Sequence, residues 1–381
     1  MLLLLLPSAF SATPTELPPF LRGDVSIGYS YDRLSGGLQE RIRYGSCDDD
    51  AGEPCVLDVG DRTLQDHRMS YALTFAAYHG LALRLEVPHY VNSSVNYANT
   101  GEMLFDAASG SGTYKGSELP EGTVQGYKGA GIGGLWIEVV GTPFSENFTK
   151  RNNKATWLLA GGIRTPDGTD HWTFQEGSVA SGAGPGGSAL RLRTAFSKRF
   201  GASEPYMSLS VTGENPYYRR QVNAENGAIL QNPTADGGSA CTTSEDFLSS
   251  SGDCTPIFLG TEVQTQLGVQ LSTAENPSSG GKFSTDLHTG FRYNSWAAVP
   301  SGSYLPEVLT VTEGTPVLQA ESLEVGVGLR LDVRFFTYLE WRIGADAYYH
   351  APQRIESVYA VYTSPDTLRV TAATELVVRV R

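Results

Sequence analysis

The chain has 381 residues with 28 Lys+Arg against 41 Asp+Glu, a formal net charge of −13. This acidic balance argues against a nucleic-acid partner, which would need a basic surface. Hydrophobic residues make up 40% of the chain, and 43 Gly with 19 Tyr at only 18% charged residues favour an all-β protein over a helical enzyme. No apolar run of about 18 residues occurs, which excludes helical membrane spans.

The N-terminus has the pattern of a secretory signal. An apolar run from Leu2 to Leu6 precedes the small residues around Ser11, where the preference for a small-residue cleavage site is met. We expect residues 1–11, or 1–12, to be a signal peptide, 12–20 an N-terminal periplasmic segment and 21–381 a single domain. The alternative is a disordered apolar N-terminus.

From there to the C-terminus, apolar and polar residues alternate with a period of two, which is typical of β-strands with one apolar face. In residues 323–333, for example, Leu323, Val325 and Val327 share one face and Glu324 lies on the other. Twelve such segments are predicted, at 21–33, 68–79, 80–90, 130–143, 154–166, 188–200, 205–215, 256–272, 283–295, 319–333, 337–349 and 367–381.

The lengths of the connections also alternate. Long ones, such as 34–66 and 91–128, take turns with short ones, such as 79–81 and 334–336. Outer-membrane barrels have this asymmetry, with long loops outside and short turns on the periplasmic side. The predicted strands are also long enough for a tilted bilayer crossing.

The polar face of these segments is too highly charged for a packed core and belongs in a charge-compensated lumen. Ten arginines lie on this face: Arg84, Arg164, Arg191, Arg193, Arg292, Arg330, Arg334, Arg342, Arg369 and Arg379. Eleven acids accompany them: Asp24, Asp32, Glu86, Glu138, Glu262, Asp286, Glu324, Asp332, Glu340, Asp346 and Glu375. We therefore predict an all-β fold, a single antiparallel transmembrane β-barrel of about twelve strands with long extracellular loops and short periplasmic turns. A soluble β-sandwich or solenoid is the alternative.

Nine of these side chains are our candidates for contact with a solute in the lumen: Glu138, Arg164, Arg191, Arg193, Asp286, His288, Arg292, Arg330 and Arg342. Arg191 and Arg193 with Arg164 on the preceding segment form the densest basic ladder, which could contact a carboxylate. The alternative for this ladder is a purely structural pairing with Glu138. His288 is the one histidine placed in mid-lumen, and no nucleophile is evident beside it.

The four cysteines form two local pairs in polar, turn-rich stretches, which predicts the disulfides Cys47–Cys55 and Cys241–Cys254 in an exported chain. A zinc site is the alternative, although neither pair has the C-x2-C spacing. Residues 129–134 spell G-x-G-x-x-G, but a strand-like segment follows them where a dinucleotide site needs a helix. We read these glycines as strand-bending residues and predict no cofactor and no metal.

Three pieces of the first half, residues 80–88, 129–135 and 159–168, resemble outer-membrane barrels of the phenol-degradation MetA-pathway type. The resemblance implies an outer-membrane location in a Gram-negative bacterium and passive uptake of hydrophobic or aromatic solutes. The expected partners are outer-membrane lipid, lipopolysaccharide and a small-molecule solute. Alternatives are a structural or surface-adhesion barrel without transport, and a membrane-embedded hydrolase.

Overall fold

The computed structural model describes residues 22–42, 56–99, 123–144, 155–166, 171–175, 178–182, 187–215, 217–223, 255–257, 260–276, 280–300, 316–356, 360–365 and 367–380. Every regular element within these ranges is a β-strand. None of the described residues belongs to a helix long and apolar enough to cross a membrane.

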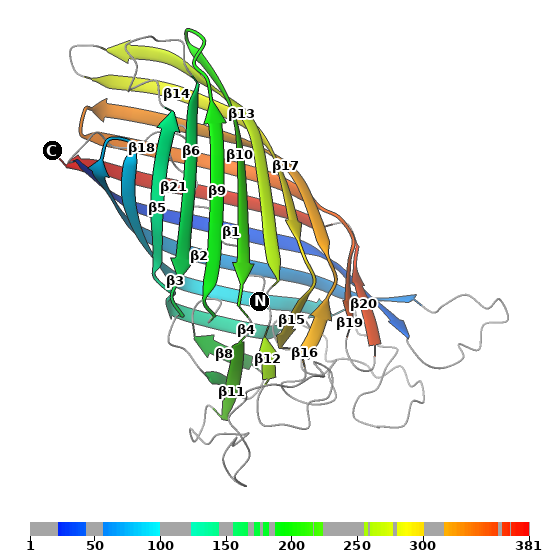
Figure 1. Cartoon of the computed structure of the whole chain (residues 1–381). Coiled ribbons are helices and arrows are strands. Elements are labelled where there is room, and N and C mark those ends of the chain that lie inside the picture. The colour runs from blue at the N-terminus through cyan, green and yellow to red at the C-terminus, as the bar shows by residue number, and fades with distance from the viewer. Residues whose placement is uncertain are drawn as a thin grey trace.

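Twelve long strands pair antiparallel with their neighbours and form a closed ring, as predicted (Figure 1). In order around the ring they are β1 (Gly23–Ile42), β2 (Val56–Tyr78), β3 (Leu81–Asn99), β5 (Trp136–Phe144), β6 (Thr156–Arg164), β9 (Ala189–Ser197), β10 (Ser203–Glu214), β13 (Thr261–Asn276), β14 (Gly281–Asn294), β17 (Ser322–Phe336), β18 (Leu339–His350) and β21 (Thr367–Val380). The ring closes between β1 and β21, where Gly23 pairs with Val380.

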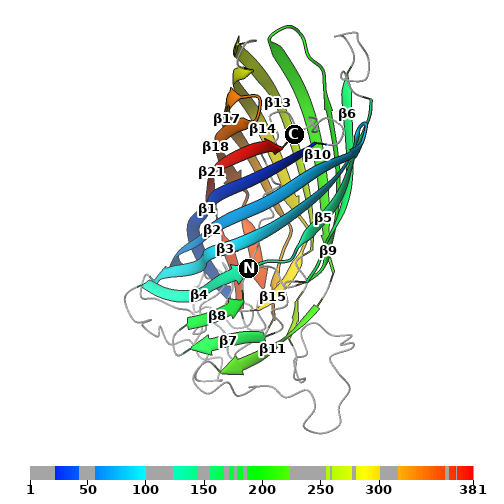
Figure 2. The same cartoon turned by 90° about the vertical axis from the view of Figure 1, so that its left-hand side faces the viewer.

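Nine further strands, most of them short, extend the wall at the end opposite the C-terminus (Figures 1 and 2). They are β4 (Thr123–Ile132), β7 (His171–Gln175), β8 (Ser178–Gly182), β11 (Tyr217–Asn223), β12 (Thr255–Ile257), β15 (Ala297–Pro300), β16 (Pro316–Gln319), β19 (Gln353–Glu356) and β20 (Ala360–Ser364). Two pairings among them, β4 with β8 and β7 with β11, are parallel.

The two faces of the ring differ sharply in chemistry, because the side chains of a strand alternate between them. Large apolar side chains on the outer face are exposed, and Val327 and Leu192 reach 65%. The inner face carries buried charged groups, including Glu324 and Arg369 at 0% exposure. This arrangement is the reverse of a soluble protein and suits a bilayer outside the ring, where closure leaves no strand edge unpaired.

A small apolar patch interrupts the polar inner face near the end with the short turns. It consists of Ala76, Ala82, Val140, Leu158, Ala160 and Ala195, all buried. These residues lie on β2, β3, β5, β6 and β9. On the far side of the ring, β17 and β18 carry Asp332, Glu340 and Arg342 near the same end. The inner wall is therefore apolar on one side and charged on the other at this level.

Several boundaries differ from the sequence prediction, and the predicted strand 256–272 is found at Thr261–Asn276. Residues 34–66 and 91–128 were expected to be loops, but β1 and β2 remain paired as far as Arg41 and Val56, and β3 continues to Asn99 against β4. These extensions carry polar residues on both faces, so the apolar alternation that marks a membrane crossing is missing from them. The turn between β17 and β18 lies at Thr337–Tyr338, not at 334–336.

The predicted strand 130–143 is two strands, separated at residues 133–135. Gly133 donates a backbone hydrogen bond to the carbonyl of Pro88 at 2.8 Å. A Cβ on Gly134 would lie only 1.9 Å from the carbonyl oxygen of Thr165, so no larger residue fits without movement of the backbone. The glycines of the G-x-G-x-x-G stretch thus break and bend the wall, in line with the sequence interpretation.

Candidate functional site: the polar interior of the barrel

The inner wall near β5 is organised around Glu138, which is buried at 1% exposure. Arg193 donates to its carboxylate at 2.8 Å, and Arg191 lies 3.5 Å from the other oxygen. Arg84 on β3 approaches within 3.9 Å. Glu138 thus lies among three arginines, of which Arg84 also lies 3.4 Å from Glu86. This is the purely structural pairing that the sequence analysis gave as the alternative to contact with a solute carboxylate.

Two further contacts separate the members of the predicted basic ladder. The Arg191 guanidinium lies 3.8 Å from the ring centroid of Trp136, a cation–π contact. Arg164 does not join Glu138: it donates to the carbonyl of Gly187 at 2.8 Å and pairs with Glu214. The structure therefore brings Arg191 and Arg193 together at Glu138. Arg164 pairs with Glu214 instead, although its guanidinium also lies 5.6 Å from the centroid of the Trp136 ring.

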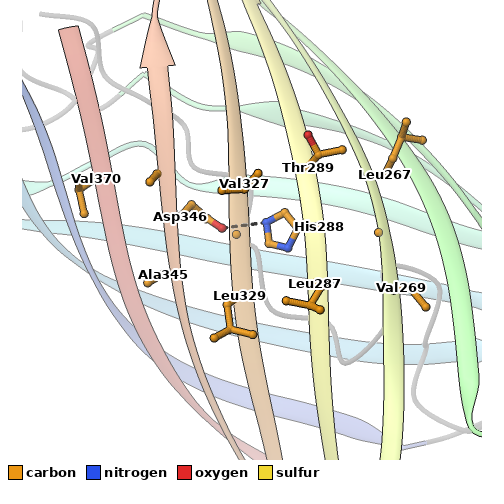
Figure 3. A pocket seen from close by; sticks show the side chains of 13 residues that line it. Leu267, Val269, Leu287, His288, Thr289, Val327, Leu329, Ala345, Asp346 and Val370 are labelled. Atoms are coloured by element: carbon orange, nitrogen blue, oxygen red, sulfur yellow. Dashed lines mark ion pairs between the residues drawn. The ribbon is translucent and has the colours of Figure 1, made fainter.

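A second group lies on β10, β14, β17 and β18, and we call it the inner girdle: Tyr206, Asp286, His288, Arg330 and Asp346. His288 Nε2 lies 2.8 Å from Asp346 Oδ1, and Figure 3 shows the two side chains meeting across β17. The hydroxyl of Tyr206 donates to both carboxylate oxygens of Asp286, at 3.0 and 2.9 Å. Arg330 Nη1 lies 3.8 Å from Asp286, so the girdle extends over five successive strands of the ring, from β10 to β18.

Glu324 organises a third group, nearer the end with the short strands. Arg292 Nη1 lies 3.1 Å from one of its oxygens, and Arg369 contacts the other. Arg369 also lies 3.3 Å from Asp32 on β1. The Arg292 guanidinium packs over the ring of Tyr348, 5.3 Å from its centroid.

Arg342 belongs to a fourth group near the short turns. It bridges Glu340 at 2.7 Å and Glu375 at 3.0 Å. Glu340 also accepts from Arg334 at 3.0 Å and from Arg379 at 2.7 Å. All nine residues that the sequence predicted as lumen candidates therefore face inward. Each of them contacts at least one other side chain of the inner wall.

Sequence reasoning assigned the faces but missed which partners meet. It also missed Tyr206, which is buried at 5% exposure and donates to Asp286 on the inner wall. Gly162, Gly268 and Gly328 each occupy the strand that two partners span. These inward glycines are visible in the sequence, but the sequence alone does not say which two side chains meet over each of them.

The described residues contain no group of three or more His, Cys, Asp or Glu side chains that could hold a metal ion. All four cysteines lie outside the described residues, so the predicted disulfides remain predictions. Within the described inner face, acids and arginines compensate one another locally. The chemistry available there is hydrogen bonding and ion pairing with a passing solute.

A mainly apolar depression of about 770 Å³ lies on the wall over β13, β14, β17, β18 and β21, and its lining also includes His288 and Asp346. Its rim includes Leu287, Val327 and Leu329, which are 43–65% exposed (Figure 3). Thr289 also lines it, and its hydroxyl donates to the carbonyl of Gly326 at 2.9 Å. This part of the outer face therefore presents hydrocarbon, as a wall in contact with lipid requires.

Comparison with known proteins gives no family model and no curated protein that matches the chain. Among solved structures, an outer-membrane channel from Pseudomonas putida F1 has a TM-score of 0.45 at 11% identity, over 96% of this chain and 98% of that one. A FadL homologue from Pseudomonas aeruginosa has a TM-score of 0.38 at 9% identity, over 94% and 90% of the two chains. The outer-membrane protease OmpT from Escherichia coli has a TM-score of 0.32 at 8% identity, over 96% and 99%.

These similarities concern architecture, and with both channels and a protease among them they leave function to the residues of this chain. The closed ring, its apolar exterior and its even number of antiparallel strands are the features of bacterial outer-membrane barrels. The chain therefore has the architecture of an outer-membrane β-barrel.

Proposed function

We propose that the chain is a passive channel that admits small solutes, hydrophobic or aromatic ones among them, across the outer membrane. The observation that carries this proposal is the charged inner face of a lipid-embedded ring. Burying so many ionisable groups is costly, and a barrel that served only as an anchor could be filled with apolar side chains instead. A polar inner face is the usual property of barrels with an aqueous pathway.

The size of the ring limits what can pass. Twelve strands enclose a lumen between the filled interior of eight-stranded barrels and the open channel of sixteen-stranded porins. The described inward side chains pack closely against one another, and Glu138 and Arg292 are at most 1% exposed. We therefore expect slow flux of small molecules.

The inner wall is balanced in charge, and near the short turns it is apolar on one side and charged on the other. These two properties support a pathway with little preference between anions and cations that admits solutes with an apolar part. Each arginine described above has an acidic partner, so strong preference for anions or cations is not expected. The alanine-rich patch headed by Ala82 offers apolar contact opposite the charged strands β17 and β18. An aromatic solute with one polar substituent would be compatible with both walls.

Planar-bilayer recording of the purified chain tests the proposal directly. We expect small, weakly selective conductance steps that depend on insertion of the folded protein, identified by heat-modifiable migration in detergent. A folded barrel that conducts nothing would overturn the channel and favour a structural or adhesion barrel.

One observation favours that second candidate: the close burial of the inner face also suits a sealed barrel whose outer segments act on a surface. The two functions separate on deletion of residues 224–254, which lie outside the described residues and include both Cys241 and Cys254. An adhesion barrel would lose surface binding on this deletion, whereas the conductance of a channel would persist.

A further inference from the structure

Three contacts on the inner wall join strands that are not neighbours. Glu138 on β5 reaches Arg193 on β9 across β6, Tyr206 on β10 reaches Asp286 on β14 across β13, and His288 on β14 reaches Asp346 on β18 across β17. Neighbouring strands lie about 4.8 Å apart, so each pair spans about 10 Å of wall. Side chains that meet over this span must lie along the wall and not point toward the axis.

A glycine occupies the crossed strand in each case. The register places Gly162 between Glu138 and Arg191, Gly268 between Tyr206 and His288, and Gly328 between His288 and Asp346. A Cβ on Gly162 would lie 2.4 Å from Glu138 Cγ.

The other two positions are equally tight. A Cβ on Gly268 would lie 2.7 Å from the Tyr206 hydroxyl and 2.8 Å from His288 Cβ. One on Gly328 would lie 1.9 Å from Asp346 Oδ1 and 2.3 Å from His288 Nε2. Contacts this short exclude any side chain at the three glycines unless the side chain lying over each of them moves.

The same arrangement recurs with an aromatic ring. Tyr348 lies over Gly326, where an added Cβ would be 2.6 Å from its Cγ, and its hydroxyl would be 2.7 Å from a Cβ on Gly290. The ring thus lies flat along two successive strands, and Arg292 packs over it. Four long side chains are held against the wall by glycines beneath them.

We propose that Gly162, Gly268 and Gly328 are positioning residues that set the bore of the channel, which rests on the proposed function. Each glycine provides a slot, a place on the wall where a long polar side chain can lie flat. There the side chain forms its ion pair or hydrogen bond with a partner in the same wall. The slots therefore keep these side chains out of the passage. Adding a methyl group in a slot drives the overlying side chain toward the axis and narrows the passage.

Gly161 and Gly162 provide a matched comparison within one strand. Gly162 faces inward under Glu138, whereas a Cβ on Gly161 faces outward and meets only Leu192 Cδ2, at an ordinary 3.6 Å. The variants Gly161→Ala and Gly162→Ala change the same strand by the same methyl group on opposite faces. The change in intrinsic strand propensity is therefore the same in both variants.

The test is permeation of neutral sugars of rising size, from arabinose to glucose to sucrose, into liposomes that carry equal amounts of heat-modifiable protein. We expect Gly161→Ala to match the wild-type size limit. Gly162→Ala, Gly268→Ala and Gly328→Ala should each lose the largest sugar that the wild type admits and show lower single-channel conductance. Because these sugars carry no charge, a change in their permeation reports the width of the passage and not its charge.

The pair Glu138→Ala and Gly162→Ala/Glu138→Ala supplies a second test. Both variants leave Arg84, Arg191 and Arg193 without Glu138, so they differ only by the methyl group at residue 162. With no Glu138 side chain to displace, the two should have the same size limit, an outcome that general destabilisation of the wall by Gly162→Ala would not give. This comparison also serves if Gly162→Ala alone fails to assemble. Folded slot variants with the wild-type size limit and conductance would overturn the inference while leaving the channel intact. A folded wild-type chain without conductance would overturn both.

Discussion

Arg292 Nη1 lies 3.1 Å from Glu324 Oε2, with both side chains at 0% exposure on neighbouring strands β14 and β17. Glu324 is shared with Arg369, so its removal would leave two buried guanidinium groups without their acid. Breaking a buried ion pair from one side costs much more than the pair contributes, because the remaining charge stays desolvated.

Glu324→Gln should therefore lower the free energy of unfolding by about 3–5 kcal/mol. Urea unfolding in lipid vesicles, followed by heat-modifiable migration, measures this change. Glu321→Gln, at an exposed position just before β17, is the control and should shift the midpoint little. Equal midpoints for the two variants would show that the pair contributes nothing to stability.

Glu138 gives a prediction about ion preference. Glu138→Gln removes one negative charge from the inner wall and leaves Arg84, Arg191 and Arg193 without their shared acid. The reversal potential in a KCl gradient should move toward chloride selectivity. Arg193→Gln, which leaves Arg191 and Arg84 near the acid, should move it slightly toward potassium. Shifts of the same sign in both variants would contradict the pairing.

The lipid-facing wall predicts that a charged substitution on the outer face lowers stability, whereas an apolar one at the same position does not. Val327 lies near the middle of β17 and is 65% exposed on the outer face. Val327→Lys should cost about 2–4 kcal/mol of stability in a bilayer if it lies near the midplane. Val327→Leu is the matched control and should be nearly neutral. Urea titration in vesicles distinguishes the two, and a neutral Val327→Lys would place this face away from lipid.

The cysteine pairs give a prediction that does not involve the barrel. Non-reducing peptide mapping should recover Cys47 linked to Cys55, and Cys241 linked to Cys254. Each short loop closure would stabilise its segment by about 2–3 kcal/mol. Replacing all four with serine should leave heat-modifiable migration unchanged, because the ring closes through backbone pairing. Four free thiols, or a bridge between the two segments, would refute the assignment.

The membrane-crossing strands were predictable because every second residue of such a strand faces lipid and must therefore be apolar. Leu323, Val325 and Val327 follow this pattern, and the segment 319–333 overlaps most of β17. The polar strand extensions were not predictable in this way. Arg62 and Asp61 lie in the paired part of β2, but without an apolar partner face they resemble a loop in sequence.

The interior was predictable in composition and not in its contacts. That Arg193 faces inward follows from alternation alone. That it meets Glu138 depends on the stagger of β5, β6 and β9 after the ring has closed, and stagger leaves no trace in the sequence of one strand. Gly162 was visible in the sequence, but its meaning required knowing which side chain lies over it.

The seam between β1 and β21 has a consequence for biogenesis. Gly23 pairs with Val380, so the contact that closes the ring joins residues near opposite ends of the chain. Contacts of such long sequence separation form slowly, because a large loop entropy must be lost before they yield any energy. Until β21 arrives, β1 and β18 both have open edges that lipid cannot satisfy and that invite association with other strands. A nascent chain released before its last strand would thus be prone to aggregation, and an assembly factor would have to shield these two edges until the end.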